Sequence, residues 1–416
     1  MKGGEEVPRH AMQRDADRLT KLWCWPFHLL PGVSEALRHV QFEQAYALFQ
    51  ASRRMLGAPE FGIETVRRQG GESVPVTVTT VAHTPFCRLL RFAAGSGTNV
   101  VARPKLLLCA PQAGHYVALM RDAVRSLLDD SDVYVTEWID ARDIPPEAGA
   151  LSLEDHVLTL ERFMASLEPA TLDVLAICQA TVPALVAGGR LAARGEQQLR
   201  SLVLMGGPID ARCHPTSLGR TARGLSAEWF AQRCTGLVPR GYPGAGRRVY
   251  PGFLQLSSLA GDPSRQVGAF LEAVLSVSRG DSQGVAASVL DAADFSVPLD
   301  LPAEFVEDTT DVVFRRFLLP NGKWYIDGAR VRLDSMRDTH LLTIEGADDT
   351  ITGAGQTHAA HLLCTRLPSS YRERITVSQC DHYGLFRGKA WYAQVYPLLR
   401  RRLAAWRATA DHDSIA

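Results

Sequence analysis

The stretch TLDVLAICQATVPALVAGGR, residues 171–190, decides how this chain folds. It places the apolar run DVLAI directly before Cys178, and a helix-like run follows the cysteine. A short apolar run that ends in a turn and leads into a helical pattern predicts a buried strand followed by a helix. The cysteine at this junction is either a small buried core residue or a nucleophile held on a tight turn.

The same alternation of strands and helices extends on both sides of this stretch. Near-continuous apolar strands that alternate with helices predict a parallel sheet covered on both faces, with catalytic groups at the carboxyl ends of the strands. Residues 74–92, with alternating Val and Thr, predict opening antiparallel strands. The predicted parallel strands are KLLLCAP (105–111), DVYVTEWID (132–140), DVLAI (173–177), SLVLMGGPID (201–210), THLLTIEGADD (339–349) and RITVSQC (374–380).

The chain divides into segments of different character. Apolar residues recur at three- and four-residue intervals in SEALRHVQFEQAYALFQASRRML, which predicts an N-terminal helical extension. A later segment rich in Gly, Pro and aromatic residues interrupts the alternation, which predicts an insertion over the sheet edge. The predicted fold class is therefore α/β, a mostly parallel sheet with helices on both faces. The expected segments are the extension (1–58), the first part of the core (59–210), the inserted cap (211–335) and the second part of the core (336–416).

Composition excludes several classes of function. The 45 basic and 45 acidic residues cancel, which argues against a protein dedicated to nucleic acid. No apolar run reaches signal-peptide or membrane-span length, so we expect neither export nor a membrane span. The eight cysteines show no paired spacing, so we expect free thiols in a reducing cytoplasm, with no metal site.

The residues around the cysteine match a known catalytic turn. Ala176-Ile177-Cys178-Gln179-Ala180 follows the small-x-nucleophile-x-small pattern of the strand-to-helix elbow in α/β-hydrolases, usually G-x-S-x-G. The flanking residues must be small because the tight turn brings them against neighbouring elements. A thiol at a helix N-terminus also gains from the helix dipole, which favours the reactive thiolate.

A nucleophile of this kind needs an acid and then a histidine further along the chain. The stretch LLTIEGADDTI supplies Asp349 as the predicted orienting acid, with Asp348 as the alternative. The stretch TVSQCDHYGLF supplies His382 after the last predicted strand. Three residues in the expected order, each at the end of a strand, predict a Cys178–His382–Asp349 triad.

The chemistry of such a triad also requires donors for an oxyanion. One donor is expected to be the backbone N–H of Gln179, and the other that of Gln112 in the loop PQAGHY. His115 in this loop is expected to contact substrate. His358 and His361 are three residues apart without a third ligand, so we interpret them as surface residues and not as a metal site.

At this point the chain resembles the intracellular poly(3-hydroxybutyrate) depolymerases, a cysteine branch of the α/β-hydrolases akin to polyhydroxyalkanoate synthases. The resemblance implies hydrolysis of stored polyester on cytoplasmic granules, without a cofactor, by the nucleophile Cys178, the acid Asp349 and the base His382. A homodimer is a further hypothesis. The blocks that carry the resemblance are PEFGI, TPFCRLLRF, CAPQAGHY, VYVTEWIDARDIP, AICQATVP, FLLPNGKWYIDG, LLTIEGADD, GQTHAAHLLC, HYGLF and WYAQVYP.

The chain departs from this family at two positions. Ala180 stands where the family usually has Pro, and Asp381 stands where it usually has Gly before the histidine. A carboxylate at Asp381 is expected to raise the pKa of the neighbouring histidine. In the predicted cap, Trp229 and Trp324 are the candidates for docking an apolar polymer, with packing inside the cap as the alternative.

Three other functions compete with this interpretation. A small-ester or dienelactone-type thiol hydrolase would act on soluble esters, but such enzymes rarely carry a large insertion. A synthase-like acyltransferase would use the same triad, but synthases usually have Gly on both sides of the cysteine, where this chain has Ala. A catalytically inactive granule-surface protein would bind granules without turnover.

Overall fold

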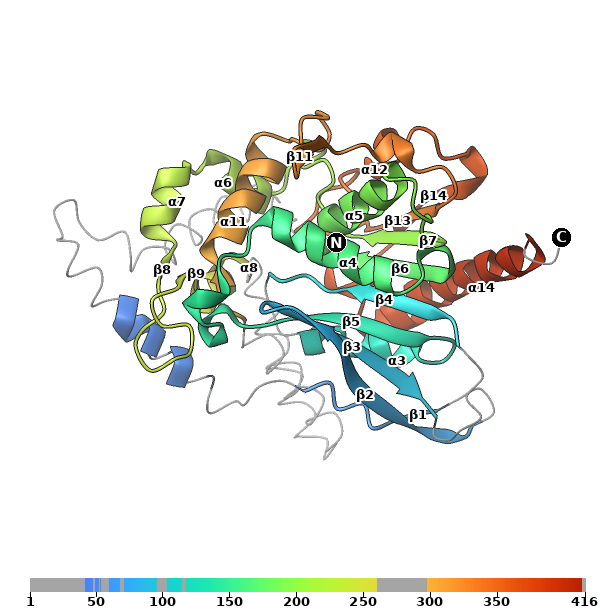
Figure 1. The fold of residues 1–416 in the computed structure, drawn as a ribbon, viewed down its shortest axis with the longest axis horizontal. Helices are drawn as coiled ribbons and strands as arrows, with labels where there is room; N and C mark the ends of the chain where they lie inside the picture. Colours follow the sequence, from blue (N-terminus) through green and yellow to red (C-terminus); the bar gives the residue numbers. More distant parts are fainter. Residues whose placement is uncertain are drawn as a thin grey trace, which may run out of the picture.

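The computed structural model describes residues 42–47, 49–51, 53, 60–67, 71–95, 103–113, 117–259 and 298–413. A nine-stranded sheet forms the centre of the molecule (Figure 1). Its strands follow the order β1-β2-β3-β5-β4-β6-β7-β13-β14. Their bounds are β1 (Thr65–Arg67), β2 (Ser73–His83), β3 (Cys87–Ala94), β5 (Asp132–Trp138), β4 (Lys105–Cys109), β6 (Leu172–Ile177), β7 (Ser201–Met205), β13 (His340–Gly346) and β14 (Arg372–Val377).

The directions of the strands identify the fold. The first strands, β1 to β3, pair antiparallel, and β3 pairs antiparallel with β5. All pairings from β5 onward, through β4, β6, β7 and β13 to β14, are parallel. Antiparallel opening strands, a crossover that places β4 beyond β5, and a nucleophile candidate directly after the central β6 are the arrangement of an α/β-hydrolase. The predicted fold class is confirmed.

Two hydrophobic layers cover the two faces of this sheet. Alternate residues of β6 point to opposite sides, since Val174 packs in one core cluster and Leu175 in the other. Helices α4 (Leu153–Ser166) and α5 (Thr181–Ala193) supply the first cluster, and α3 (Arg121–Leu127) and α14 (Tyr396–Asp413) supply the second. Every residue of β6 is buried, as expected for a parallel strand covered on both faces.

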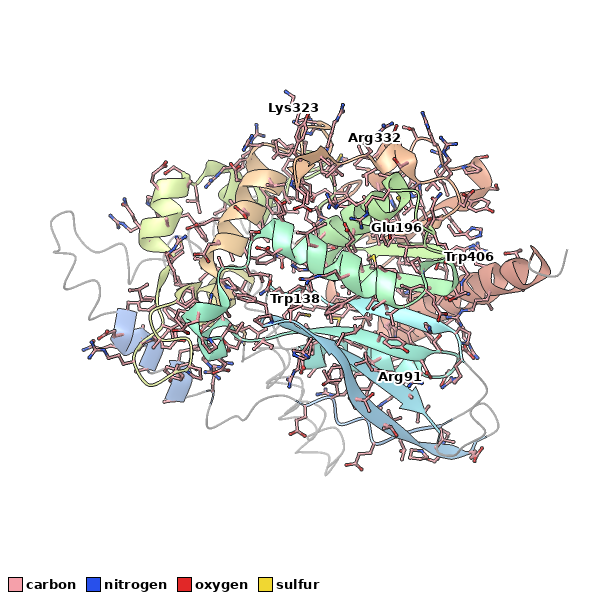
Figure 2. The ribbon with its side chains drawn as sticks, in the orientation of Figure 1. Arg91, Trp138, Glu196, Lys323, Arg332 and Trp406 are labelled. Carbon is pink, nitrogen blue, oxygen red and sulfur yellow. The ribbon has the colours of Figure 1, made fainter. Side chains whose placement is uncertain are left out.

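The end of β5 shows how the first layer packs. Trp138, labelled in Figure 2, is the last residue of β5 and packs against His156 of α4, with ring centroids 4.0 Å apart. His156 is fully buried, and burial lowers its pKa to about 3, so the ring is neutral. Helix α4 begins with a capping box: the Ser152 hydroxyl accepts from the Asp155 N–H at 3.0 Å, and the Asp155 carboxylate accepts from the Ser152 N–H at 2.8 Å.

The chain between β7 and β13 leaves the sheet. In Figure 1 its first elements lie together at one end of the sheet, whereas its last pair of short strands lies over α5. Its elements include α6 (Ser217–Gly224), α7 (Ala227–Arg233), β8 (Gly236–Leu237), β9 (Arg248–Tyr250), α8 (Gly252–Leu259), β10 (Leu301–Pro302), α11 (Ala303–Thr309), β11 (Tyr325–Ile326) and β12 (Ala329–Arg330). The helical pattern DTTDVVFRRFLL corresponds to the end of α11 and a π-helical turn, Thr310–Arg315, whereas VGAFLEAVLSV lies outside the described residues.

A buried arginine ties this insertion to the core. The Arg247 guanidinium donates to the carbonyls of Ile144 at 3.0 Å, Gly149 at 2.7 Å and Pro145 at 2.6 Å. These three carbonyls belong to the loop after β5. The insertion is therefore held against the carboxyl edge of the sheet at this point.

One helix is shorter in the structure than its sequence pattern indicates. The pattern of GQTHAAHLLCTRL predicts a helix over residues 355–367, but the structure limits the helix to α12 (Ala360–Leu363), because backbone N–H groups ahead of it bond to the Glu345 side chain instead of to a helical carbonyl. In the N-terminal extension, the described residues 42–47, 49–51 and 53 are helical, and the remainder of 1–58 lies outside the described residues. Within the part of the chain that is described, no helix is long and apolar enough to span a membrane.

Candidate active site

Cys178 occupies a strained turn between β6 and α5. Its φ angle is +54°, in the left-handed region that a residue with a side chain rarely adopts. The chain passes from the strand through a 3-10 turn, Cys178–Ala180, into the helix, and the Thr181 hydroxyl donates to the Cys178 carbonyl at 2.7 Å. Ala176 and Ala180 are fully buried, which explains why the flanking residues are small. Cys178 itself is half-buried, so its thiol is not part of the closed core.

Two glycines after β7 make room for this turn. Gly206 has a φ of +56°, and a Cβ there would lie 3.2 Å from Cε1 of His382. A Cβ on Gly207 would lie 1.7 Å from the Thr181 Oγ1, closer than any real contact. The end of β7 therefore packs directly against both the elbow and the histidine.

We expect Gly207→Ala to lower the free energy of unfolding by about 1–3 kcal/mol, because an added methyl group overpacks the Thr181 side chain. Activity should fall as well, since Thr181 holds the Cys178 carbonyl. Urea unfolding measures the first effect and ester turnover the second. Gly224→Ala is the matched control, because a Cβ there meets no atom within 4 Å. Equal stability of the two variants would contradict this packing argument.

Asp349 and His382 form a buried pair. His382 Nδ1 lies 2.7 Å from Asp349 Oδ2, and their side chains are 6% and 2% exposed. The other carboxylate oxygen of Asp349 accepts from the N–H groups of Ile351 and Thr352, both at 2.8 Å. Asp348 is exposed, and its N–H donates to the Cys380 carbonyl. Of the two candidate acids, the structure therefore places Asp349 against the histidine.

His382 also interacts with Cys178. Burial lowers the pKa of His382, but the charges of Cys178 and Asp349 and hydrogen bonds to both side chains outweigh burial and raise its pKa to about 10. A raised pKa means that the imidazolium form of His382 is favoured. The histidine thus bridges the two other residues predicted from the sequence, which lie on different loops.

The loop after β4 lies next to the elbow. The Gln179 side chain accepts from the Ala113 N–H at 2.9 Å, which joins the two segments expected to supply oxyanion donors. Gln112 is fully buried, and its side-chain amide has no hydrogen-bond partner among the described residues. His115, the residue expected to contact substrate, lies outside the described residues.

The two tryptophans of the insertion have different surroundings. Trp229 lies half-buried on α7. Trp324 is 5% exposed and packs in the main core cluster, so it offers no aromatic surface to a polymer. The sequence prediction fails for Trp324 because its neighbour Tyr325, 58% exposed, is the aromatic side chain that faces out from this stretch.

Two acidic residues near the pair have roles that the sequence did not predict. The Asp381 carboxylate accepts from the Gly384 N–H at 2.8 Å and so fixes the turn after the histidine. Cys178 and Asp349 raise the pKa of His382, whereas Asp381, which was expected to raise it, is not among the groups that do so. Glu345 is buried four residues before Asp349, and a charged residue inside the apolar run HLLTIEG is the signal that could have revealed it.

The interpretation of His358 and His361 as surface residues is wrong for His361, which is buried, while His358 is half-buried. Both contact the Thr343 hydroxyl, His358 through Nδ1 at 2.7 Å and His361 through Nε2 at 2.9 Å. Burial comes first among the causes that lower the pKa of His361 to about 4, followed by the neighbouring positive charges. Across the described residues, no group of three or more His, Cys, Asp or Glu side chains is arranged to hold a metal ion.

Comparison with known families and structures adds to this geometry. Residues 206–406 match the family model described as PHB de-polymerase C-terminus. The match begins at Gly206 and includes Asp349 and His382, while Cys178 precedes it. No curated protein matches the chain.

Several solved structures are similar to this chain. A soluble variant of monoglyceride lipase from Saccharomyces cerevisiae is 14% identical, with 80% of this chain and 96% of that chain covered and a TM-score of 0.49. A fungal esterase from Rhizomucor miehei is 12% identical, with 88% and 90% covered and a TM-score of 0.45. A carboxylesterase from the thaumarchaeon Nitrososphaera gargenis is 12% identical, with 80% and 100% covered and a TM-score of 0.43.

The strand order identifies the fold independently of these similarities. The family match covers the insertion and the two last strands of the sheet. Residues 206–406 of the chain therefore match the PHB depolymerase C-terminus family, and the chain is an ester hydrolase built on the α/β-hydrolase fold.

Proposed function

We propose that the chain hydrolyses the ester bonds of stored poly(3-hydroxyalkanoate) with a Cys178–His382–Asp349 triad. The observation that carries this proposal is that His382 Nδ1 lies 2.7 Å from Asp349 Oδ2, while Cys178, on its strained turn, is near enough for its charge to raise the pKa of the same imidazole. A nucleophile, a base and an orienting acid in contact are the minimum set for acyl transfer. The substrate class comes from the family match over residues 206–406.

Acylation begins with the thiolate of Cys178 and the imidazolium of His382. The sulfur attacks the ester carbonyl, and the carbonyl oxygen becomes an oxyanion. The backbone N–H groups of Gln179 and Gln112 are the proposed donors to this oxyanion, and losing one such donor costs on the order of 3 kcal/mol of transition-state stabilisation. His382 then gives its proton to the leaving alkoxide, which departs as the hydroxyl end of the polymer, and an acyl-thioester remains on Cys178.

Deacylation uses the same residues in the reverse order. Neutral His382 takes a proton from water, and the resulting hydroxide attacks the thioester carbonyl. The second tetrahedral intermediate collapses by breaking the carbon–sulfur bond, which releases the 3-hydroxy acid and restores the thiolate. Asp349 keeps the imidazole in the tautomer that carries its proton on Nδ1, so that the other ring nitrogen faces the sulfur.

We assign the insertion, residues 211–335, the role of a cap that presents a segment of the insoluble polymer to this triad. Trp229 on α7 is half-buried and keeps the role of a docking residue, and Tyr325 takes the place predicted for Trp324. Action on cytoplasmic granules and assembly as a homodimer are parts of the same proposal. His115 remains the predicted substrate contact in the loop after β4.

Native amorphous polyhydroxybutyrate granules provide the test. The protein should release 3-hydroxybutyrate and short oligomers from them in buffer alone, while Cys178→Ala should release none. Assays with soluble p-nitrophenyl esters, run in parallel, distinguish a hydrolase that acts on the granule polymer from one that acts only on small esters. Turnover of the soluble esters without release from granules would leave the ester hydrolase and overturn the polymer as substrate. If release of 3-hydroxybutyrate units requires added coenzyme A, then the thiol of coenzyme A, and not water, is the acyl acceptor.

A further inference from the structure

Glu345 is a buried carboxylate that the mechanism above does not use. It is the residue before Gly346 at the end of β13, and it is 4% exposed. A carboxylate in such a place is costly unless hydrogen-bond donors surround it. Its donors therefore indicate what the side chain is for.

The donors come from the backbone of the segment that follows Asp349. Oε2 of Glu345 accepts from the Gly355 N–H at 2.7 Å. Oε1 accepts from the N–H groups of Thr357 at 2.8 Å and His358 at 3.0 Å. Hydrogen bonds to an ionised carboxylate are about twice as strong as neutral ones. Glu345 thus fastens one end of the 349–358 loop to the strand from which the loop departs.

The same loop carries the contacts that place Asp349. Thr352 donates through its hydroxyl to the Gly206 carbonyl at 2.8 Å, and its N–H donates to Asp349. The Thr357 hydroxyl donates to the Gly207 carbonyl at 3.0 Å and accepts from the Gly207 N–H at 2.9 Å. Gly206 packs beside the His382 ring. The loop held by Glu345 is therefore continuous with the acid, with the end of β7 and with the histidine.

We propose that Glu345 is a positioning residue for the triad, which acts by fixing the 349–358 loop so that Asp349 meets His382 at Nδ1. This inference rests on the proposed function of Asp349 as the orienting acid. The contacts described for Glu345 are with Gly355, Thr357 and His358, and none is with Cys178, His382 or Asp349. Its contribution depends on accepting three backbone N–H groups at once, which a carboxylate does and an amide does not.

The variant that tests this is Glu345→Gln. Glutamine keeps the volume, but its NH₂ group would face a backbone N–H donor, so the loop must shift. We expect kcat/KM for ester hydrolysis to fall by about 10- to 100-fold, since a displacement of ~1 Å at a catalytic group can cost about 10²-fold. The pKa of His382 should also fall, because Asp349 is one of the charges that raise it.

Two comparisons distinguish a positioning role of Glu345 from a merely structural one. Glu161→Gln is the matched control, because Glu161 is a buried glutamate, 5% exposed, that pairs with Arg190 and Arg194 on α5 and its C-terminal end. This control should lose stability without changing the His382 titration or the pH profile. In the second comparison, Glu345→Gln is combined with Asp349→Asn, and the double variant should be no slower than Asp349→Asn alone.

The outcomes separate this proposal from the proposed function. An unchanged His382 titration in folded Glu345→Gln, followed by NMR of the ring, would overturn the positioning role. An equal fold-loss in the parent and in the Asp349→Asn background would overturn it too. If the parent protein hydrolyses no ester, the proposed function fails, whereas the His382 titration of Glu345→Gln still reports whether Glu345 positions Asp349.

Discussion

Cys178→Ala is expected to lower kcat/KM for ester hydrolysis by on the order of 10⁶-fold, the size of the loss when the nucleophile of a triad hydrolase is removed. The reason is that Cys178 is the thiol at the elbow. It combines the strained backbone of the turn with the interaction with His382. Cys178→Ser should keep more activity than alanine but less than the parent, because a hydroxyl is a weaker nucleophile than a thiolate. Stopped-flow turnover of a soluble ester measures these differences.

A covalent readout supports the rate measurement. Mass spectrometry of the acid-quenched parent should show a thioester adduct that Cys178→Ala lacks. Cys234→Ala is the matched control, since Cys234 is likewise half-buried and lies beside α7, away from the elbow. This control should form the adduct at the parental rate. An adduct of undiminished yield in Cys178→Ala would refute the assignment of the nucleophile.

The same variant should change the titration of His382. The charge of Cys178 and the hydrogen bond to it both raise the pKa of the imidazole. Removal of the sulfur leaves burial as the opposing effect, so the pKa of His382 should fall. NMR of the ring in the parent and in Cys178→Ala measures this shift without any substrate.

Asp349→Asn is expected to lower kcat by about 10⁴-fold, as when the acid of a serine-protease triad is replaced by its amide. The buried carboxylate accepts a hydrogen bond from His382 at 2.7 Å, whereas an amide can present its NH₂ group and stabilise the wrong imidazole tautomer. Asp348→Asn serves as the control, because Asp348 is exposed and only its backbone N–H is engaged, with the Cys380 carbonyl. A loss in Asp348→Asn as large as in Asp349→Asn would reverse the choice of acid.

The parent protein and Asp349→Asn should differ in the pH dependence of kcat/KM, in a direction set by the pKa of His382. The pKa of His382 in the folded chain lies above its ordinary value of 6.5, at about 10. The stability that His382 contributes through its interactions with Cys178 and Asp349 is therefore fully present below pH 6.5 and is lost as the pH rises through about 10. Asp349→Asn removes one of the raising charges, so the alkaline limb of its kcat/KM profile should move to lower pH than in the parent.

Much of the site could be predicted from local sequence because its three candidate catalytic residues follow the ends of strands. Cys178 follows an apolar strand and precedes a helix, and both properties are written in the residues next to it. Asp349 and His382 follow in the order that the fold requires. The choice of Asp349 over Asp348 could not be made in the same way, because adjacent residues share one sequence environment and only the loop conformation turns one of them inward.

Other features depended on contacts between distant segments. The sequence pattern placed a long helix where the backbone N–H groups of Gly355, Thr357 and His358 bond to Glu345, and local periodicity cannot report a side-chain acceptor ten or more residues away. Trp324 was predicted to be a docking surface, but it is buried because the neighbouring segments close over it. Local sequence does not distinguish an aromatic residue that is buried in the core from one that is exposed on the surface.

Local sequence is sufficient to specify the alternation of strands and helices, the capping box that starts α4 and the small residues around Cys178, because each depends on residues a few positions apart. Long-range packing, in contrast, selects the carboxylate that bonds to His382, the side chain that holds the loop of this carboxylate and the aromatic residues that remain exposed. These properties depend on burial and hydrogen bonding between segments that become neighbours only after the sheet has formed.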